Sequence, residues 1–273
     1  MNIVLVGCDP WFTGWNRALA GGLRSLGHFV ETRKGMPPVA ECDLLVCLGP
    51  HEYGPPPAGI ATKVAIWTEH DSSQFFHEAL GMTGSQYRDL VSGWYDIVVS
   101  MIDGQAGRLA IPFLPAWPEF EAHDSALSCE RPVGCYWYGT VTPRRKEILD
   151  SIASEVEIVI PTARIWGEAK EDALRAAKVT VLPHAWDGPC AEPFRYADAA
   201  ATGTILVCEA AEKALPYDAG SHFVSVPASE MAAAVKHALA NFDSYREMRR
   251  RALENARRYD ACFAAKGLLE LVG

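Results

Sequence analysis

Residues 179–207 read VTVLPHAWDGPCAEPFRYADAAATGTILV, and this stretch alternates between two kinds of pattern. Val179–Leu182 is a short apolar run that ends in a polar loop, which is typical of a buried strand. The small and apolar residues after Arg195 predict a helix, with Gly203 as its C-terminal cap. Ile205–Val207 is a second apolar run. The stretch therefore predicts a strand, a loop, a helix and a second strand of one parallel sheet.

The same alternation runs along the whole chain. The apolar runs that predict strands are Ile3–Val6, Phe29–Val30, Leu44–Leu48, Val64–Trp67, Ile97–Val99, Val133–Tyr138, Val156–Ile160, Val179–Leu182, Ile205–Val207 and Phe223–Val226. Predicted helices between and after them include Trp15–Leu26, Pro143–Ser154, Glu168–Ala176, Ser229–Ala240, Ser244–Arg258 and Ala261–Leu271. A proline-rich, polar segment at 111–132 interrupts the alternation. We therefore predict an α/β protein of two Rossmann-like domains, residues 1–125 and 126–273, with the amphipathic last helix a candidate to pack back on the first domain.

Composition and charge limit the classes of protein to which this chain can belong. The 273 residues carry a net charge of −9, which disfavours a broad nucleic-acid surface because such surfaces need an excess of Lys and Arg. The apolar start of the chain is too short for a signal peptide, and no apolar run is long enough to span a membrane. The eight cysteines form no CxxC pair, and several lie in apolar runs, which favours free thiols over disulfides or a zinc site. These features predict a cytoplasmic protein.

The loop and helix inside the opening stretch carry the residues with the clearest chemistry. Ligands of doubly wound domains bind at the carboxyl ends of the strands, where this loop lies. Arg195 and Asp198 are three residues apart, so they share one face of the helix. An Arg and the free N–H groups at a helix start can hold phosphate oxygens, and a carboxylate can accept from both hydroxyls of a ribose. The pair predicts a nucleotide site.

These residues also carry a family resemblance. Arg195-x-x-Asp198-x-x-Ala201-x-Gly203, followed by Ile205-Leu206-Val207, resembles the C-terminal domain of group 1 glycosyltransferases of the GT-B fold, in particular the spore-maturation-type branch. That branch has Glu where this chain has Asp198. A second alignment instead matches Glu192-Pro193-Phe194 to the Glu-Pro-Phe of the broader family, and it makes Glu192 a candidate contact for donor-sugar hydroxyls.

The resemblance extends to the residues on both sides of the motif. Gly139, Arg144, Arg145 and Lys146 follow the first strand of the second domain, where such enzymes have a diphosphate clamp. His184 follows the strand that ends at Leu182 and becomes a further donor-site candidate. In the first domain, Gly14 ends a loop that the resemblance places near the donor phosphates. Glu69, His70 and Asp71 follow the fourth strand and offer the density of ionisable groups that acid–base chemistry needs.

The resemblance implies two domains that face a cleft and a glycosyltransferase that takes its sugar from a nucleotide-diphosphate donor such as a UDP-sugar. It implies a retaining reaction, and because no DxD pair stands in a metal-binding loop, no metal or other cofactor is expected. A non-catalytic binding protein of the same fold and a nucleotide-sugar epimerase are the alternatives. The sequence does not identify the acceptor, which can be a saccharide, a protein, a small metabolite or a modified nucleobase.

Overall fold

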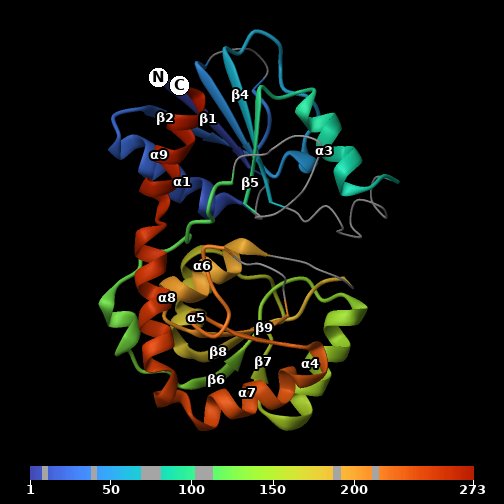
Figure 1. Ribbon diagram of the computed structural model, residues 1–273, viewed down its shortest axis with the longest axis vertical. Helices are drawn as coiled ribbons and strands as arrows, with labels where there is room; N and C mark the ends of the chain where they lie inside the picture. Colours follow the sequence, from blue (N-terminus) through green and yellow to red (C-terminus); the bar gives the residue numbers. More distant parts are fainter. Residues whose placement is uncertain (8–11, 38–41, 69–80, 102–112, 187–191, 211–214) are drawn as a thin grey trace. The chain divides into compact units, whose positions relative to one another are not determined.

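The computed structural model (Figure 1) describes residues 1–7, 12–37, 42–68, 81–101, 113–186, 192–210 and 215–273. The chain divides into two compact units. The N-terminal unit holds residues 1–119 together with 259–273, and the C-terminal unit holds residues 120–258. The last helix therefore belongs to the N-terminal unit, although it follows the other unit in sequence.

The N-terminal unit contains a parallel five-stranded sheet of order β2-β1-β3-β4-β5. β1, the first strand in sequence, pairs with β2 on one side and β3 on the other. The side chains of β3 are buried along its whole length, as expected of a strand covered on both faces. The strands are β1 (Asn2–Gly7), β2 (Phe29–Arg33), β3 (Leu44–Leu48), β4 (Thr62–Trp67) and β5 (Ile97–Ser100).

Helices cover both faces of this sheet. Among the described residues of the unit, the helices are α1 (Thr13–Ser25), η1 (Pro50–Glu52), α3 (Gly84–Ser92) and α9 (Ala261–Val272). α1 packs against α9, and the glycine at position 22 allows this because any Cβ there would overlap the Ala261 backbone. On the other face, Tyr87 and Val91 of α3 pack with β-strand residues such as Trp67.

The C-terminal unit repeats the same strand order. Its parallel sheet runs β10-β9-β8-β6-β7, so in chain order the first strand lies between the second and the third, as in the other unit. The strands are β6 (Val133–Tyr136), β7 (Ile158–Val159), β8 (Ala177–Leu182), β9 (Ile205–Glu209) and β10 (Val224–Val226). The helices are η2 (Asp124–Leu127), α4 (Pro143–Glu155), α5 (Gly167–Ala176), α6 (Pro193–Ala201), η3 (Ala228–Glu230), α7 (Met231–Ala240), η4 (Phe242–Tyr245) and α8 (Arg246–Arg258).

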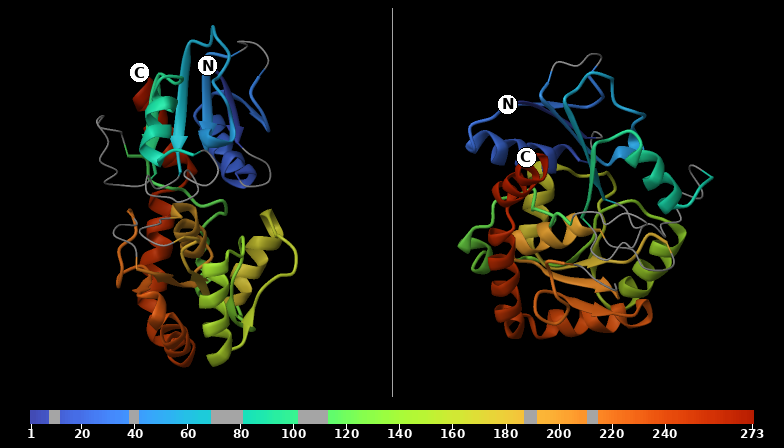
Figure 2. Two further views of the ribbon diagram at one scale, coloured as in Figure 1. Left: turned by 90° about the vertical axis from the view of Figure 1, so that its right-hand side faces the viewer. Right: turned by 45° about the horizontal axis from the view of Figure 1, so that its top comes forward.

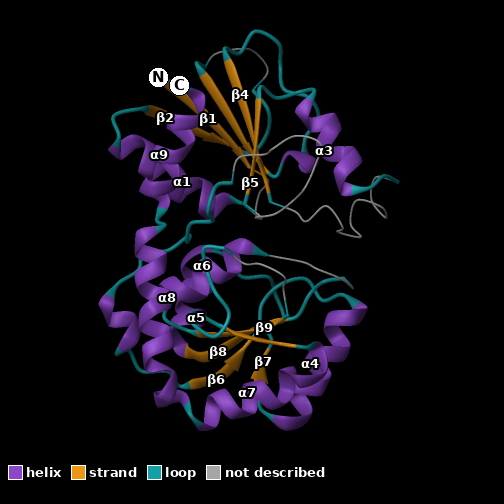
Figure 3. Ribbon diagram, in the orientation of Figure 1, coloured by secondary structure: helices purple, strands orange, loops and turns teal. Residues whose placement is uncertain are grey.

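Helices lie on both faces of this sheet (Figures 1 and 3), and two apolar layers hold them to it. One contains Ile152 of α4 and Val235 of α7, packed on strand residues such as Val181. The other contains residues of α6 and α8, including Ala197 and Ala256, packed on the opposite side of the strands. Figure 2 gives two further views of these layers within each unit. The prediction of an α/β protein with two Rossmann-like domains is confirmed.

The strand order decides where a ligand would bind. In a sheet of this order the chain turns to opposite faces on either side of the first strand, which leaves a crevice at the carboxyl ends of the first and third strands. In the C-terminal unit these strands are β6 and β8. None of the helices in the described ranges has both the length and the apolar character needed to cross a bilayer.

Candidate functional site

The crevice in the C-terminal unit is built by the loops that follow β6 and β8. Thr142 ties them together: its hydroxyl donates to the carbonyl oxygen of Ala185 at 2.9 Å and accepts from the backbone N–H of Arg145 at 3.2 Å. The second bond caps the N-terminus of α4. The start of α4, with its partial positive charge, is therefore fixed at the crevice.

Arg145 spans the crevice from the first turn of α4. Its Nε donates to the carbonyl oxygen of Pro183 at 3.0 Å, and its Nη1 donates to that of Thr140 at 3.2 Å. Its Nη2 pairs with the carboxylate of Glu192. Only 5% of the Arg145 side chain is exposed. The guanidinium is thus held between the loops after β6 and β8.

Arg195 reaches the same carboxylate from α6. Its Nε lies 2.6 Å from Oε2 of Glu192, so each carboxylate oxygen binds a different arginine. The guanidinium also donates to the carbonyl oxygen of Tyr138 and lies 4.4 Å from the centre of the Tyr138 ring. Gly139 makes this approach possible, because a Cβ at that position would overlap the Arg195 guanidinium. Gly139 also has a φ of +139°, which side chains rarely adopt.

A second ion pair lies at the carboxyl end of β9. Both terminal nitrogens of Arg144 pair with the Glu209 carboxylate, and Nη1 also donates to the carbonyl oxygen of His184 at 3.1 Å. The backbone N–H of His184 donates to Oε2 of Glu209 at 3.0 Å. Glu209 was not predicted as a site residue, although it is the first charged residue after an apolar strand and so stands at the expected edge.

The ion pairs keep these groups charged near neutral pH. Burial opposes ionisation of Glu192, but the positive charges of Arg145 and Arg195 outweigh it and lower the pKa of that carboxyl. Burial likewise disfavours ionised Glu209, and the hydrogen bond from Arg144 more than offsets it, so its pKa is also lowered. Burial works against the charge on Arg195, yet Glu192 raises its pKa. The crevice therefore holds three guanidinium charges, two at the start of α4 and one in the first turn of α6.

Six of the nine predicted donor-site residues come together in this network: Gly139, Arg144, Arg145, His184, Glu192 and Arg195. Lys146 does not join it. Its side chain is 64% exposed and pairs with Asp150 one turn along α4, at 2.6 Å. The helical rotation of about 100° per residue carries it to the outer face of α4.

Asp198 is buried, whereas the prediction expected it to face a ribose. Its side chain is 0% exposed and its Oδ2 lies 3.0 Å from Nζ of Lys170, which is itself 1% exposed. A carboxylate buried in this way does not present its oxygens to a ribose. Lys170, on α5, was not singled out in the sequence, and its helix pattern gave no signal, because a lysine on an amphipathic helix is ordinarily a solvent-facing residue.

The predicted residues of the N-terminal unit are less informative. Glu69, His70 and Asp71 lie outside the described residues. Gly14 lies in the first turn of α1, and a Cβ there would overlap the carboxylate of Glu119. Nearby, the indole of Trp117 donates to the carbonyl oxygen of Trp15 at 2.9 Å. These contacts fasten the segment before residue 119 to α1, which explains the glycine without a ligand.

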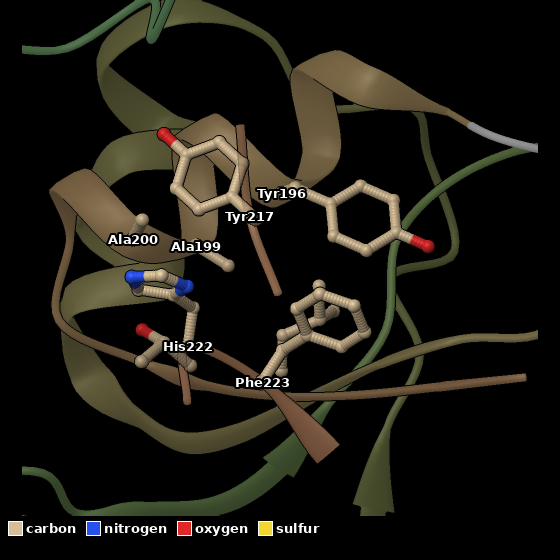
Figure 4. A pocket seen from close by; sticks show the side chains of 8 residues that line it. Tyr196, Ala199, Ala200, Tyr217, His222 and Phe223 are labelled. Atoms are coloured by element: carbon tan, nitrogen blue, oxygen red, sulfur yellow. The ribbon is translucent and has the colours of Figure 1, made fainter. Parts of the chain in front are cut away.

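A small cavity lies beside α6, away from the arginines (Figure 4). Its lining includes Tyr196, Tyr217, His222 and Phe223. In Figure 4 the hydroxyl groups of Tyr196 and Tyr217 point in opposite directions. Its volume of about 10 Å³ is the space of a single water molecule, so it is not a nucleotide site. Within the described residues, no group of three or more His, Cys, Asp or Glu side chains could hold a metal ion. The six described cysteines are free thiols.

Comparison with known proteins returned neither a matching family model nor a matching curated protein sequence. Solved structures do match. HepE of Anabaena, in complex with UDP-glucose, superposes with a TM-score of 0.68 at 13% identity, over 100% of this chain and 99% of that one. Sucrose-phosphate synthase from Thermosynechococcus elongatus gives 0.65 at 14% identity, over 100% and 98%. AviGT4, a glycosyltransferase involved in avilamycin A biosynthesis, gives 0.59 at 16% identity, over 99% and 96%.

TarM also matches, but this chain spans only about half of it: the alignment covers 84% of this chain and 54% of TarM, with a TM-score of 0.61. At such low identities the likeness shows the fold. The predicted GT-B class, with two Rossmann-like units in one chain, is the class to which these structures belong.

Proposed function

We propose that the protein transfers a sugar from a nucleotide-diphosphate donor, with the diphosphate bound at the start of α4. The observation that carries this proposal is the pair of buried guanidiniums, Arg145 and Arg195, fixed at the crevice and sharing one partly exposed carboxylate, Glu192. Guanidiniums and a helix N-terminus are the groups that bind phosphate oxygens best. The structural likeness to HepE, which has been solved with UDP and with UDP-glucose, supports a uridine nucleotide as donor.

In the proposed reaction, an acceptor hydroxyl forms a bond to the anomeric carbon while the bond from that carbon to the β-phosphate oxygen breaks. The diphosphate leaves with one more negative charge, and Arg145 and Arg195 stabilise it electrostatically. The hydroxyl proton passes to a base, for which Glu69, His70 and Asp71 remain our candidates. Because guanidiniums supply the positive charge, we propose a metal-independent reaction. The resemblance of the α6 motif to the spore-maturation-type branch is our reason to propose retention of configuration.

The remaining assignments follow the geometry. Glu192 is 28% exposed and borders the arginines, so we keep it as a contact for the donor. His184 would act through its backbone, which fixes Arg144 and Glu209. A cytoplasmic location fits the free thiols of the described cysteines.

Isothermal titration with UDP, GDP and ADP tests the proposal. We expect UDP to bind, and we expect Arg145→Met to weaken binding at least about tenfold, since a charge-assisted contact contributes about 1.5–3 kcal/mol. Lys146→Met is the matched control, because it removes the same charge from the neighbouring, exposed position. If no nucleotide binds, or if both variants lose affinity equally, the proposed site is wrong.

One observation favours a second candidate, a non-catalytic nucleotide-binding protein. Asp198, the position where the family's ribose-binding carboxylate stands, is buried against Lys170. Mass spectrometry of UDP-glucose incubated with the protein and simple sugar acceptors separates the two. Transfer or slow donor hydrolysis supports the enzyme, binding without turnover supports the non-catalytic protein, and an isomerised donor would identify an epimerase.

A further inference from the structure

A buried ion pair lies directly behind the arginine site. Nζ of Lys170, on α5, lies 3.0 Å from Oδ2 of Asp198, on α6, and neither side chain is more than 1% exposed. Lys170 belongs to no predicted site, and Asp198, which was predicted to bind a ribose, is fully buried. Burying two charges costs several kcal/mol per ion in desolvation, and hydrophobic residues of similar size often give equal or better stability. The pair therefore calls for an explanation beyond stability.

The pair and the donor-site arginine share one aromatic ring. Lys170 Nζ lies 5.8 Å from the centre of the Tyr138 ring, and the Arg195 guanidinium lies 4.4 Å from the same centre. Burial raises the pKa of Tyr138 to about 12, so the ring stays neutral and is available to both cations. The Lys170 ammonium also lies 5.0 Å from the Phe120 ring. Two cations are thus arranged around Tyr138 at the carboxyl end of β6.

Asp198 could also compete with Glu192 for the Arg195 guanidinium. The two residues are three apart on α6, the spacing at which helical side chains meet, and the Asp198 charge contributes to the raised pKa of Arg195. In the structure Arg195 nevertheless turns to Glu192 and to the Tyr138 carbonyl. The cation that pairs with the buried carboxylate is Lys170. A buried carboxylate without its cation would draw the nearest guanidinium to itself.

We infer that Lys170 is a positioning residue: it binds Asp198 and thereby leaves Arg195 directed at the diphosphate. This inference deepens the proposed function and rests on it for the identity of the ligand. It assigns Asp198 a role different from ribose binding. Removing the Asp198 charge alone then has little effect on UDP affinity, whereas removing the Lys170 charge alone redirects Arg195.

Four proteins test the inference by UDP titration: the wild type, Lys170→Met, Asp198→Asn and the double variant. We expect Lys170→Met to weaken UDP binding at least about tenfold, as loss of a charge-assisted phosphate contact does. We expect Asp198→Asn and the double variant to stay within about twofold of the wild type, since neither retains a buried anion that competes for Arg195. If Lys170 only stabilised the fold, Lys170→Met would instead lower the stability of the protein. The molecules that still fold would then keep their affinity for UDP.

A second measurement needs no nucleotide. The NMR signal of the Arg195 Nε–H group, assigned by its absence in Arg195→Lys, should shift in Lys170→Met and return to its original position in the double variant. Lys170→Gln replaces Lys170→Met if the latter does not fold, because its amide can still donate to Asp198 without a charge. An unchanged signal and an unchanged affinity would overturn the inference. Loss of affinity in Asp198→Asn would also overturn it and restore the ribose contact. Failure of the wild type to bind UDP would refute the proposed function alone, since the NMR result stands without it.

Discussion

Replacing Glu192 by glutamine gives the sharpest test of how the crevice binds an anion. The change keeps the size of the side chain and removes the negative charge that Arg145 and Arg195 share. A phosphate bound to both guanidiniums would stand about 5 Å from that carboxylate, where two unit charges repel by about 3 kcal/mol at an effective dielectric constant of about 20. Glu192 is 28% exposed, so solvent screening reduces the gain to about 1.4 kcal/mol, or about tenfold in affinity.

The assay is titration of UDP and of UDP-glucose into wild type and Glu192→Gln at pH 7.5. UDP, which has no sugar, should bind about tenfold more tightly to the variant. UDP-glucose should gain less if the carboxylate also contacts sugar hydroxyls. Glu155→Gln is the control, because Glu155 carries the same charge but is the last residue of α4, where it pairs with Lys236. Equal or weaker binding of UDP to Glu192→Gln would refute the reasoning, since the carboxylate would then not compete with the phosphate.

Three further changes test other parts of the structure. Gly139→Ala should weaken UDP binding at least about tenfold, because the added Cβ displaces the Arg195 guanidinium. Gly167→Ala is the control: this glycine also has a positive φ, but the space around it is open, so the change should lower only the melting temperature. Arg131→Met should reduce the free energy of unfolding, measured by urea titration, by at least about 3 kcal/mol, because several buried carbonyl oxygens lose their charged donor. Arg250→Met, at an exposed position, should change the free energy of unfolding little. Burial lowers the pKa of His51 to about 4. Below about pH 6.5 the unfolded chain therefore binds a proton at His51 that the folded chain does not bind. The free energy of unfolding should then fall as the pH drops from about 6.5 toward 4. Urea midpoints of His51→Gln should lose that part of the pH dependence, and an unchanged dependence would contradict it.

The fold was predictable because its signal is local. Apolar runs closed by polar loops recur at the spacing of strands and helices, and nearly every predicted element lies within a few residues of the observed one. One α-helix, α3 (Gly84–Ser92), has no predicted counterpart, and the other differences lie at the ends of elements. The predicted strand Val156–Ile160 shrinks to β7 (Ile158–Val159), which is an edge strand paired on one side only. α1 begins at Thr13, before the predicted start at Trp15.

Side-chain partners were not predictable in the same way, because they depend on which elements meet. A run of charged residues such as Arg249–Arg251 is typical of a solvated helix face. Arg250 and Arg251 do bind glutamates at the surface, but Arg249 is 5% exposed, donates to the carbonyl oxygen of Gly203 at 2.7 Å and lies 4.5 Å from the Phe242 ring centre. Successive residues of a helix point about 100° apart, so one member of a charged run can face inward. The same geometry separates Lys146 from its neighbours.

The two arginines at the start of α4 are not equivalent as phosphate ligands. Arg145 is anchored mainly by the carbonyl oxygens of Thr140 and Pro183, and an incoming phosphate would displace only its contact with Glu192. Arg144 has both terminal nitrogens on Glu209, so a phosphate there would compete with a two-point ion pair for the same nitrogens. A site in which the arginine keeps its hydrogen bonds to the protein during binding has a smaller free-energy cost of reorganisation. The clamp is therefore best assigned to Arg145 and Arg195, while Arg144 fixes the end of β9 against the loop of His184.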